Sequence, residues 1–436
     1  MTEPMTERRF LAWLFGVAAL AGLLVAAICW LVDPYLVFGR PRLAGFNDIK
    51  VAVTQREPMM KAHQASRSCG KTVILGSSRS AIGLDPDAPV WPAALRPVYN
   101  LSLAGSNLAD ARRLLQALLA HCGPDRLPTT LVIGLDFESF EHWPSGFGPV
   151  RPQPNRADQE QIDRLAQLAS RDGGWAQAPI RLWQDRAAAL LTTSAVVDSL
   201  ATLQASLRSA GANLLANGKS SEWQLRDWTL ADGAGTLFEQ KHLLVARRYA
   251  TPLQMSAEPG GTIRDMADVQ ALLDLAARHQ MVVRLAVQPS HVSHHELLDA
   301  LGFWPDFERW KRVLADTAQA QRQRGLDVLV WDFGGYETDY LEPVPARGLR
   351  GKAMASFWDP VHYRTPLGAR IVSTLLTGAA PGERLATELR PDTVDQRLAQ
   401  VRSDRAAWRL QHPEALAETQ RLRCTALPCG KPASPR

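Results

Sequence analysis

Two serines follow directly on a short apolar run. Residues 72–75 read TVIL, Gly76 breaks the run, and Ser77 and Ser78 come next. A serine hydroxyl is a weak nucleophile unless an adjacent general base removes its proton. The turn alone does not distinguish Ser77 from Ser78, or a nucleophile from a serine that only caps a helix.

A base for such a serine occurs late in the chain. Residues 357–368 read FWDPVHYRTPLG, which places Asp359 and His362 three residues apart, just before a helical pattern. At this spacing both side chains can lie on one side of a turn, so that the carboxylate fixes the imidazole tautomer and the other ring nitrogen faces a hydroxyl. The two motifs together predict a serine nucleophile with a histidine base.

These residues need a fold that brings distant segments together. Short apolar runs predict strands at residues 72–75, 98–103, 130–135, 281–287 and 326–331. Amphipathic patterns, such as those at 107–122 and 266–280, predict helices between the strands. Near-continuous apolar strands that alternate with helices are typical of a parallel sheet covered on both faces. We therefore expect a three-layer α/β/α domain whose functional loops follow the carboxyl ends of the strands.

On these residues the chain resembles the SGNH (GDSL-type) hydrolase superfamily. That superfamily has a flavodoxin-like fold in which a Gly-x-Ser after the first strand carries the nucleophile and a late Asp-x-x-His supplies its partners. The resemblance implies Ser78 as the nucleophile, His362 as the base and Asp359 as the residue that orients the base. It covers residues 71–378, apart from a long insertion.

The resemblance also implies an oxyanion hole, with one departure from the family pattern. The segment NLSLAGSN at residues 100–107 is similar to the block in which a glycine, here Gly105, donates its backbone N–H to the oxyanion. The next block normally reads Gly-Asn-Asp, but this chain has Gly-Leu-Asp, ending at Asp136. A carboxylate is a poor oxyanion donor, so either Asn107 replaces the missing amide or the hole consists of the N–H groups of Ser78 and Gly105.

Polar residues that follow predicted strands are candidates for substrate contact, and they are Arg79, Asp136, His291 and Asp332. Arg79 stands next to the proposed nucleophile and can hold an anionic substrate, or it can form a salt bridge on the helix surface. The two aspartates line the pocket or cap helices.

The histidines at 291, 294 and 295 have a spacing that a metal site can use. No carboxylate or cysteine partner is evident nearby in the sequence, so we favour a solvated loop near the site over metal binding. We expect neither a metal nor a cofactor.

The N-terminus predicts a membrane anchor. Residues 10–32 form 23 consecutive residues without a charge, preceded by Arg8 and Arg9. This is long enough to cross a bilayer as a helix. A cleaved signal peptide is the alternative, but its apolar region is shorter and no small-residue cleavage site is evident before Asp33. The two arginines favour a cytoplasmic N-terminus, so we expect a single-pass protein of the bacterial inner membrane whose catalytic domain is periplasmic.

The cysteines agree with an oxidising compartment. Cys69 precedes the first strand and Cys122 ends a helical pattern that leads back to a parallel strand, so both should lie at the same edge of the sheet. We therefore expect a Cys69–Cys122 disulfide, while Cys424 and Cys429 can close a small loop near the C-terminus. A net charge of +5 without a Lys/Arg block gives little support to nucleic acid binding.

The chain divides into six predicted parts. They are a cytoplasmic N-terminus (1–9), an anchor (10–32), a stalk (33–70), a catalytic domain (71–378), a mostly helical insertion within that domain (about 142–264) and a helical C-terminal tail (379–436). The insertion either packs on the sheet as a subdomain or forms a lid over the site.

The layout resembles a narrower set of membrane-anchored SGNH-like proteins that modify cell-envelope polymers, such as the D-alanyl-transfer protein of lipoteichoic acid synthesis and the alginate O-acetyltransferases. This implies a serine acyltransferase or esterase that acts on acyl, especially acetyl, esters of a cell-envelope or exported polysaccharide. The implied partners are an acyl-ester or glycan substrate, the bilayer, and an integral-membrane protein that supplies acyl groups. Two alternatives stay open: a simple exported carboxylesterase, and a non-catalytic envelope protein that binds glycan or acts as a scaffold.

Overall fold

A six-stranded sheet forms the centre of the structure, a computed structural model that describes residues 7–142, 177–249, 254–255, 266–380, 382 and 384–426. Its strands are β1 (Thr72–Leu75), β2 (Val98–Asn100), β3 (Thr130–Leu135), β6 (Val282–Val287), β7 (Val328–Asp332) and β8 (Thr387–Glu388). The order is β2-β1-β3-β6-β7-β8, and every pair is parallel except β7 with β8. A separate two-stranded sheet pairs β4 (Glu141–His142) with β5 (Gln254–Met255).

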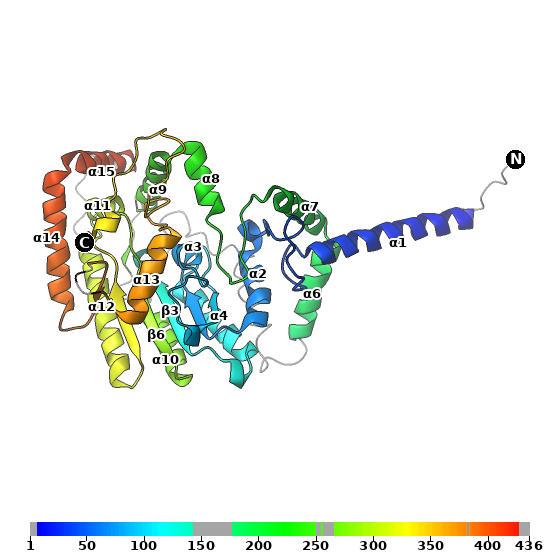
Figure 1. Cartoon of the computed structure of the whole chain (residues 1–436), viewed down its shortest axis with the longest axis horizontal. Helices are drawn as coiled ribbons and strands as arrows, with labels where there is room; N and C mark the ends of the chain where they lie inside the picture. The colour runs from blue at the N-terminus through cyan, green and yellow to red at the C-terminus, as the bar shows by residue number, and fades with distance from the viewer. Residues whose placement is uncertain are drawn as a thin grey trace.

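Helices cover both faces of the main sheet (Figure 1). The described helices are α1 (Glu7–Val32), α2 (Val53–Ser68), α3 (Ser78–Gly83), α4 (Leu108–His121), α6 (Gln177–Leu191), α7 (Thr193–Arg208), α8 (Trp223–Asp232), α9 (Ala234–Tyr249), α10 (Met266–Arg278), α11 (Val292–Ala300), α12 (Trp304–Gln323), α13 (Thr365–Thr377), α14 (Val394–Gln411) and α15 (Pro413–Ala426). Of these, α1 projects away from the sheet, and α6 and α7 lie beside its end. Single 3₁₀ turns occur at η1 (Ala93–Leu95), η2 (Pro124–Arg126), η3 (Phe137–Phe140) and η4 (Thr338–Tyr340).

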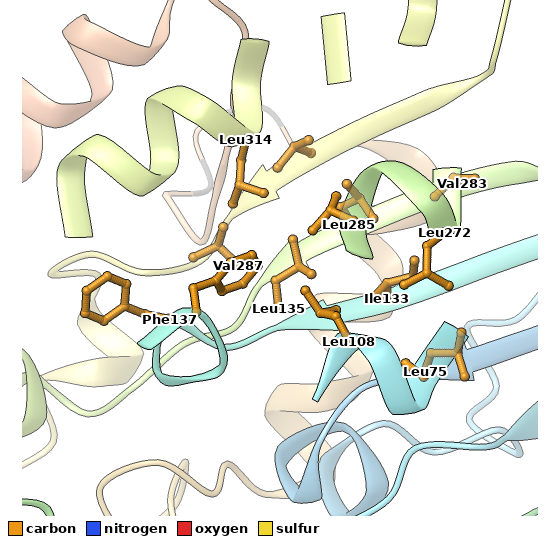
Figure 2. Close-up of a cluster of buried hydrophobic side chains, with 14 of the residues drawn as sticks. Leu75, Leu108, Ile133, Leu135, Phe137, Leu272, Val283, Leu285, Val287 and Leu314 are labelled. Carbon is orange, nitrogen blue, oxygen red and sulfur yellow. The ribbon is translucent and has the colours of Figure 1, made fainter. Parts of the chain in front are cut away.

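Alternate side chains of the strands belong to two different cores. Leu75, Ile133 and Leu285 lie in a large cluster with residues of α4, α10 and α12 (Figure 2). Ile74 and Val132 point to the other face and pack with residues of α13. Successive strand side chains point to opposite faces, so a strand buried on both sides must be apolar throughout. The predicted mixed α/β domain with a mostly parallel sheet is therefore confirmed.

The strand order creates a crevice at one edge of the sheet. Counted along the chain, the parallel strands run 2-1-3-4-5, and the connections reverse direction between β1 and β3. In open α/β sheets, ligands bind outside the carboxyl ends of the strands at such a switch point. Ser78 follows β1 at this position.

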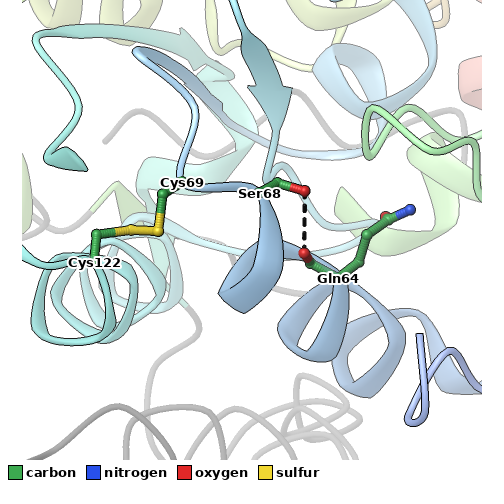
Figure 3. Close-up of a disulfide and its surroundings, with 4 residues drawn as sticks. All are labelled: Gln64, Ser68, Cys69 and Cys122. Atoms are coloured by element: carbon green, nitrogen blue, oxygen red, sulfur yellow. Dashed lines mark hydrogen bonds between the residues drawn. A yellow bond between two sulfur atoms is a disulfide. The ribbon is translucent and has the colours of Figure 1, made fainter.

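Residues 33–70, expected as a stalk, are packed into the body of the protein. Asp33, Tyr35 and Lys50 are buried, and α2 packs against α4. The end of α2 is joined to the end of α4 by a disulfide between Cys69 and Cys122, as predicted (Figure 3). Of the other expected pair, Cys429 lies outside the described residues.

The described part of the insertion contains two helical pairs with different neighbours. α6 and α7 pack against α1, whereas α9 packs against α8, α11 and α15. By length and composition α1 is long and apolar enough to cross a membrane. The bent pair of α6 and α7 is long and apolar enough only if the two helices are counted together as one span. The C-terminal part is not an isolated tail, because α14 and α15 pack on α12 and α11.

Candidate functional site

Ser78 is the first residue of α3 and points toward a histidine. The Ser77 side chain caps α3 by accepting a hydrogen bond from the Arg79 N–H, 3.3 Å away. The Ser78 Oγ lies 2.8 Å from His362 Nε2, although 284 positions separate the two residues in the chain. Gly76 has a φ of +150°, and a Cβ there would lie 2.5 Å from the Ser80 Oγ, so the tight turn before the serines requires glycine.

His362 is held from its other side by Asp359. The Nδ1 of His362 lies 2.6 Å from one carboxylate oxygen of Asp359. The other oxygen accepts the backbone N–H groups of Val361 and His362, each at 2.9 Å. Burial alone would raise the pKa of Asp359, but the adjacent His362 outweighs burial and holds that pKa well below its usual range. The ionised carboxylate therefore accepts the Nδ1 proton, which leaves Nε2 to accept a proton from Ser78.

The turn that carries Asp359 and His362 is fixed by the insertion. Glu222, which immediately precedes α8, accepts hydrogen bonds from the Trp358 indole N–H at 3.0 Å and from the Thr365 backbone N–H at 2.9 Å. The backbone N–H of Trp358 also donates to the carbonyl of His362. One carboxylate thus holds both the start of this turn and the first residue of α13.

Gly105 lies in a loop that is tied to the serine turn. The Leu103 N–H and the Ser106 hydroxyl both donate to the Gly76 carbonyl at 3.0 Å. Gly105 has a φ of +70°, in the left-handed region. Its N–H donates no hydrogen bond to any of the described residues. The N–H of Ser78 is the first of α3 and has no partner within the helix. Both N–H groups are therefore available to a ligand at the cleft.

Asn107, the other predicted oxyanion donor, caps the N-terminus of α4. Its side-chain oxygen accepts the Asp110 N–H at 2.9 Å, and the Asp110 carboxylate accepts the Asn107 N–H, which together make the capping box of α4. Asn107 is also not among the described residues that line the cleft at Ser78, whereas Gly105 is.

Glu57 and Lys61 of α2 support the Gly105 loop. Both lie in the segment that the sequence predicted to be a stalk. One Glu57 oxygen accepts the Ala104 N–H at 3.0 Å, and the other lies 3.2 Å from the Lys61 amine. Lys61 also donates to the Ser102 carbonyl. Burial lowers the pKa of Lys61, which is completely buried. A Glu-x-x-x-Lys pair in the sequence is a weak signal, because most such pairs lie on solvated helix surfaces.

A cleft of about 560 Å³ opens beside Ser78. Four segments supply most of its lining: the start of α2, α3, the Gly105 loop, and insertion residues from the α7–α8 connection into the start of α8. The insertion therefore forms one wall of the site.

Arg79 and Asp136, both predicted to contact substrate, are paired with each other. The Arg79 guanidinium lies 3.2 Å from the Asp136 carboxylate and 2.7 Å from that of Glu138. Glu138 also lies 2.7 Å from the His294 ring, and Gln288 donates to Asp136 at 2.8 Å. Burial raises the pKa of Asp136. Arg79 therefore forms a salt bridge, as one of the two alternatives predicted, but the pair is buried instead of lying on the helix surface. Its guanidinium is already paired with two carboxylates and is not free for an anionic substrate.

His291 and Asp332 lie in other parts of the fold. His291 caps α11 and lines a separate cavity of about 380 Å³, with its Nε2 2.8 Å from the Glu342 carbonyl. Asp332 is fully buried between Lys311 and Arg397, at 2.9 Å from each. Neither residue lines the cleft at Ser78, and Asp332 has the contacts of a structural ion pair.

The histidines at 291, 294 and 295 are buried and do not form the expected solvated loop. They start α11, where His294 binds Glu138 and His295 packs among the rings of Trp304, Phe307 and Tyr336. Within the described ranges, no group of three histidine, cysteine or carboxylate residues could hold a metal ion.

Comparisons of the chain with protein-family models, curated protein sequences and solved structures find no match.

Proposed function

We propose that this protein is a membrane-anchored, extracytoplasmic serine acyltransferase or esterase of the SGNH type. Its substrates would be acyl esters, in particular acetyl esters, of a cell-envelope or exported polysaccharide. One observation carries the proposal: the hydrogen-bonded series of Ser78, His362 and Asp359 opens on a cleft at the switch point of a parallel sheet. The 2-1-3-4-5 strand order also supports the flavodoxin-like architecture of that superfamily.

The proposed reaction uses each group in one role. His362 takes the proton from the Ser78 Oγ as the oxygen attacks the ester carbonyl carbon. The N–H groups of Gly105 and Ser78 stabilise the tetrahedral oxyanion. Protonated His362 then gives its proton to the departing alcohol oxygen, which leaves an acyl-Ser78 intermediate. A sugar hydroxyl or a water molecule, deprotonated by His362, accepts the acyl group and regenerates Ser78.

The placement outside the cytoplasm rests on two further observations. Arg8 and Arg9 lie at the N-terminal end of α1, and basic residues favour the cytoplasmic side of a span. The Cys69–Cys122 disulfide is typical of an exported domain, because cytoplasmic thiols are kept reduced. An integral-membrane protein that supplies acyl groups belongs to the same proposal.

Labelling with a fluorophosphonate probe tests the proposal, because the probe forms a stable adduct with an activated serine. Mass spectrometry of the labelled full-length protein should find the adduct on Ser78, and Ser78→Ala should remove it. Ser77→Ala is the matched control, which should lose about 1 kcal/mol of stability as a helix cap but still be labelled. Absence of any adduct on the wild-type protein would favour the non-catalytic alternative.

Transfer and hydrolysis are separated by a second assay. An acetyl ester donor is supplied with and without an oligosaccharide acceptor, and the products are identified by mass. Acetylated oligosaccharide supports transfer, whereas product found only as free acetate makes the protein an esterase.

A further inference from the structure

The outer faces of α6 and α7 carry large apolar side chains that nothing in the described structure covers. Between 59% and 76% of the surface of each side chain is exposed, and the residues are Trp183, Leu191, Val197, Leu200 and Leu207. In a soluble protein such side chains normally face the core. We call these five residues the α6–α7 apolar face.

α7 is amphipathic in the reverse sense to a soluble helix. Its buried residues are small or carry hydroxyl groups: Ala195, Ser199, Thr202, Ala205 and Ser206. Three of its large aliphatic residues, Val197, Leu200 and Leu207, are exposed, whereas Val196 packs against the cluster that contains Cys29. A helix in water places its apolar stripe against the protein. This inversion indicates that the outer side of α7 meets an apolar medium.

Charge is nearly absent from the same stretch. Residues 187–207 contain one charged side chain, Asp198, and it accepts a 2.6 Å hydrogen bond from the Tyr35 hydroxyl. Arg186 and Arg208 flank the stretch, and the Arg186 guanidinium lies 5.4 Å from the centre of the Trp183 ring. Tryptophan and basic residues at the ends of an apolar segment are typical of the membrane–water interface.

The contact of α6 and α7 with α1 determines how deep the two helices would lie in a bilayer that α1 crosses. Both helices pack against α1 near its C-terminal end, where Cys29 shares a cluster with Ala189 and Ala195 (Figure 1). The apolar run of α1 is about 34 Å long as a helix, close to the thickness of the hydrocarbon core, so Cys29 lies near its outer boundary. The Arg40 guanidinium lies 4.0 Å from the centre of the Trp30 ring, one residue further along α1.

We propose that α6 and α7 lie in the outer leaflet of the bilayer, as an interfacial hairpin with its apolar face among the lipid chains. The inference rests on the proposed anchoring role of α1. Neither helix is long enough to span the bilayer alone, and the bend of 68° between them fits a pair that lies along the surface. The apolar face thus fits lipid better than a second copy of the chain or a protein partner, because it adjoins the helix that enters the bilayer.

This placement brings the cleft at Ser78 close to the membrane surface. Val53 and Ala212 belong to the cluster that surrounds Cys29, and both also line the cleft. One hydrophobic cluster therefore extends from the end of α1 to the wall of the substrate cleft. The hairpin would hold the cleft at the bilayer, where a polymer or an acyl donor carried on lipid is within reach.

Depth-dependent fluorescence quenching tests the proposal on the full-length protein in vesicles of phosphatidylethanolamine and phosphatidylglycerol. In a Cys29→Ser background, Leu200→Cys and Leu207→Cys are each labelled with an environment-sensitive dye, and lipids with a spin label on the acyl chain act as quencher. Leu410→Cys is the matched control, because Leu410 is an exposed leucine of α14, away from α1, and its exposed fraction of 86% is larger than those of Leu200 and Leu207. We expect a several-fold greater loss of fluorescence at positions 200 and 207 than at 410.

Two results would overturn the proposal. Quenching at 200 and 207 equal to that at 410 would place the hairpin in water, and a blue-shifted dye without lipid quenching would mean that protein covers it. Leu20→Cys, in the middle of α1, reports on the anchor. Quenching at position 20 without quenching at position 200 would reject the membrane placement of the α6–α7 hairpin and leave that of α1 standing. Probe labelling of Ser78 in the same vesicles reports separately on the proposed chemistry.

Discussion

The Asp359 carboxylate divides its two oxygens between the ring of His362 and the backbone of its own turn. An asparagine can keep the backbone contacts with its oxygen but presents an N–H to the His362 Nδ1, which forces the proton onto Nε2 and blocks the base. Asp359→Asn should therefore leave the fold intact and slow the labelling of Ser78 by roughly 10³- to 10⁴-fold. Stopped time courses with the fluorophosphonate probe measure this rate, and labelling at the wild-type rate would remove Asp359 from the mechanism.

Gly105 allows a test of the oxyanion loop without a steric clash. A Cβ at this position meets no atom within 4 Å, so Gly105→Ala adds only the strain of a left-handed residue, about 1 kcal/mol. If relief of that strain turns the Gly105 N–H away, turnover of an ester substrate should fall by roughly 100-fold.

Gly302→Ala is the matched control for this change. Gly302 has a φ of +87°, its Cβ would also meet no atom within 4 Å, and it follows α11 outside the cleft. The control should lose the same stability and retain full turnover. Equal turnover in the two variants would mean that the added methyl group does not displace an oxyanion donor.

At the scale of elements, α2 acts on the site through a buried ion pair. Glu57→Gln leaves the Lys61 ammonium without a charge partner and should lower the free energy of unfolding by about 3 kcal/mol, because an unpaired buried charge is costly. The double variant Glu57→Gln/Lys61→Met removes both charges and should be the more stable of the two. Urea unfolding in detergent micelles measures the free energy of unfolding of both variants. A double variant less stable than Glu57→Gln alone would contradict the pairing.

The disulfide joins α2 to α4 across 53 residues of chain. Restricting a loop of this length in the unfolded state stabilises the native state by roughly 4 kcal/mol on the chain-entropy model. Cys69→Ser/Cys122→Ser should therefore unfold at lower urea concentration, by a free energy of that order. Cys29→Ser, which removes a free buried cysteine and keeps the disulfide, is the comparison. Reducing agent should destabilise Cys29→Ser as it does the wild-type protein, and it should leave the double variant unchanged.

The sequence predicted those elements whose own residues determine their burial. β1 and β3 have the predicted bounds because both faces of each strand are covered, so all of their residues are apolar or β-branched. β2 was predicted to reach Leu103 but ends at Asn100, where the chain turns toward β1 to form the Gly105 loop. β8 was missed because a two-residue edge strand has no periodicity.

The candidate site divides along the same line. Ser78 was found from the Gly-x-Ser turn after β1, and Asp359 and His362 from their three-residue spacing, because each motif is local and chemically specific. Glu57 and Glu222 were missed, since each acts on a loop that is distant in sequence and neither has a local pattern that distinguishes it from a surface carboxylate. Arg79 was misassigned because the sequence does not show that Asp136 and Glu138 fold onto it.

At the scale of the whole molecule, the segments proposed to reach the membrane adjoin those that line the cleft. Val53 and Ala212 contribute to both, so movement of α1 against α2 would change the shape of the cleft wall. At the other end of the strand order α12 packs on β7, and α14 and α15 pack on α12 and α11. Ion pairs such as that of Arg409 with Glu296 connect these C-terminal helices to the core.

Buried histidines near α11 should set the acid stability of the folded chain. Burial lowers the pKa of His291 to about 4 and also lowers those of His242 and His295, whereas in the unfolded chain each lies near 6.5. The folded state thus keeps these rings neutral, and the stability that they contribute is complete above pH 6.5. Below that pH the unfolded state binds protons that the folded state does not, so this stability is lost as the pH falls toward 4.

His291 alone accounts for about 3 kcal/mol of this loss, since its pKa differs by roughly 2.5 units between the two states. The slope of the unfolding free energy against pH is proportional to the number of protons taken up on unfolding. His291→Gln should therefore reduce this slope between pH 6 and 4.5 by the equivalent of roughly one proton. Urea unfolding at half-unit intervals of pH measures this slope. Asp359 and Glu138 have pKa values held below their usual ranges, so protonation of these carboxyls in the unfolded chain adds to the slope near pH 4.5. That contribution is the same in the wild-type protein and the variant, so the difference between their slopes reports on His291. An unchanged slope in the variant would mean that the His291 ring takes up its proton in the folded protein, and that the cavity beside it is open to water.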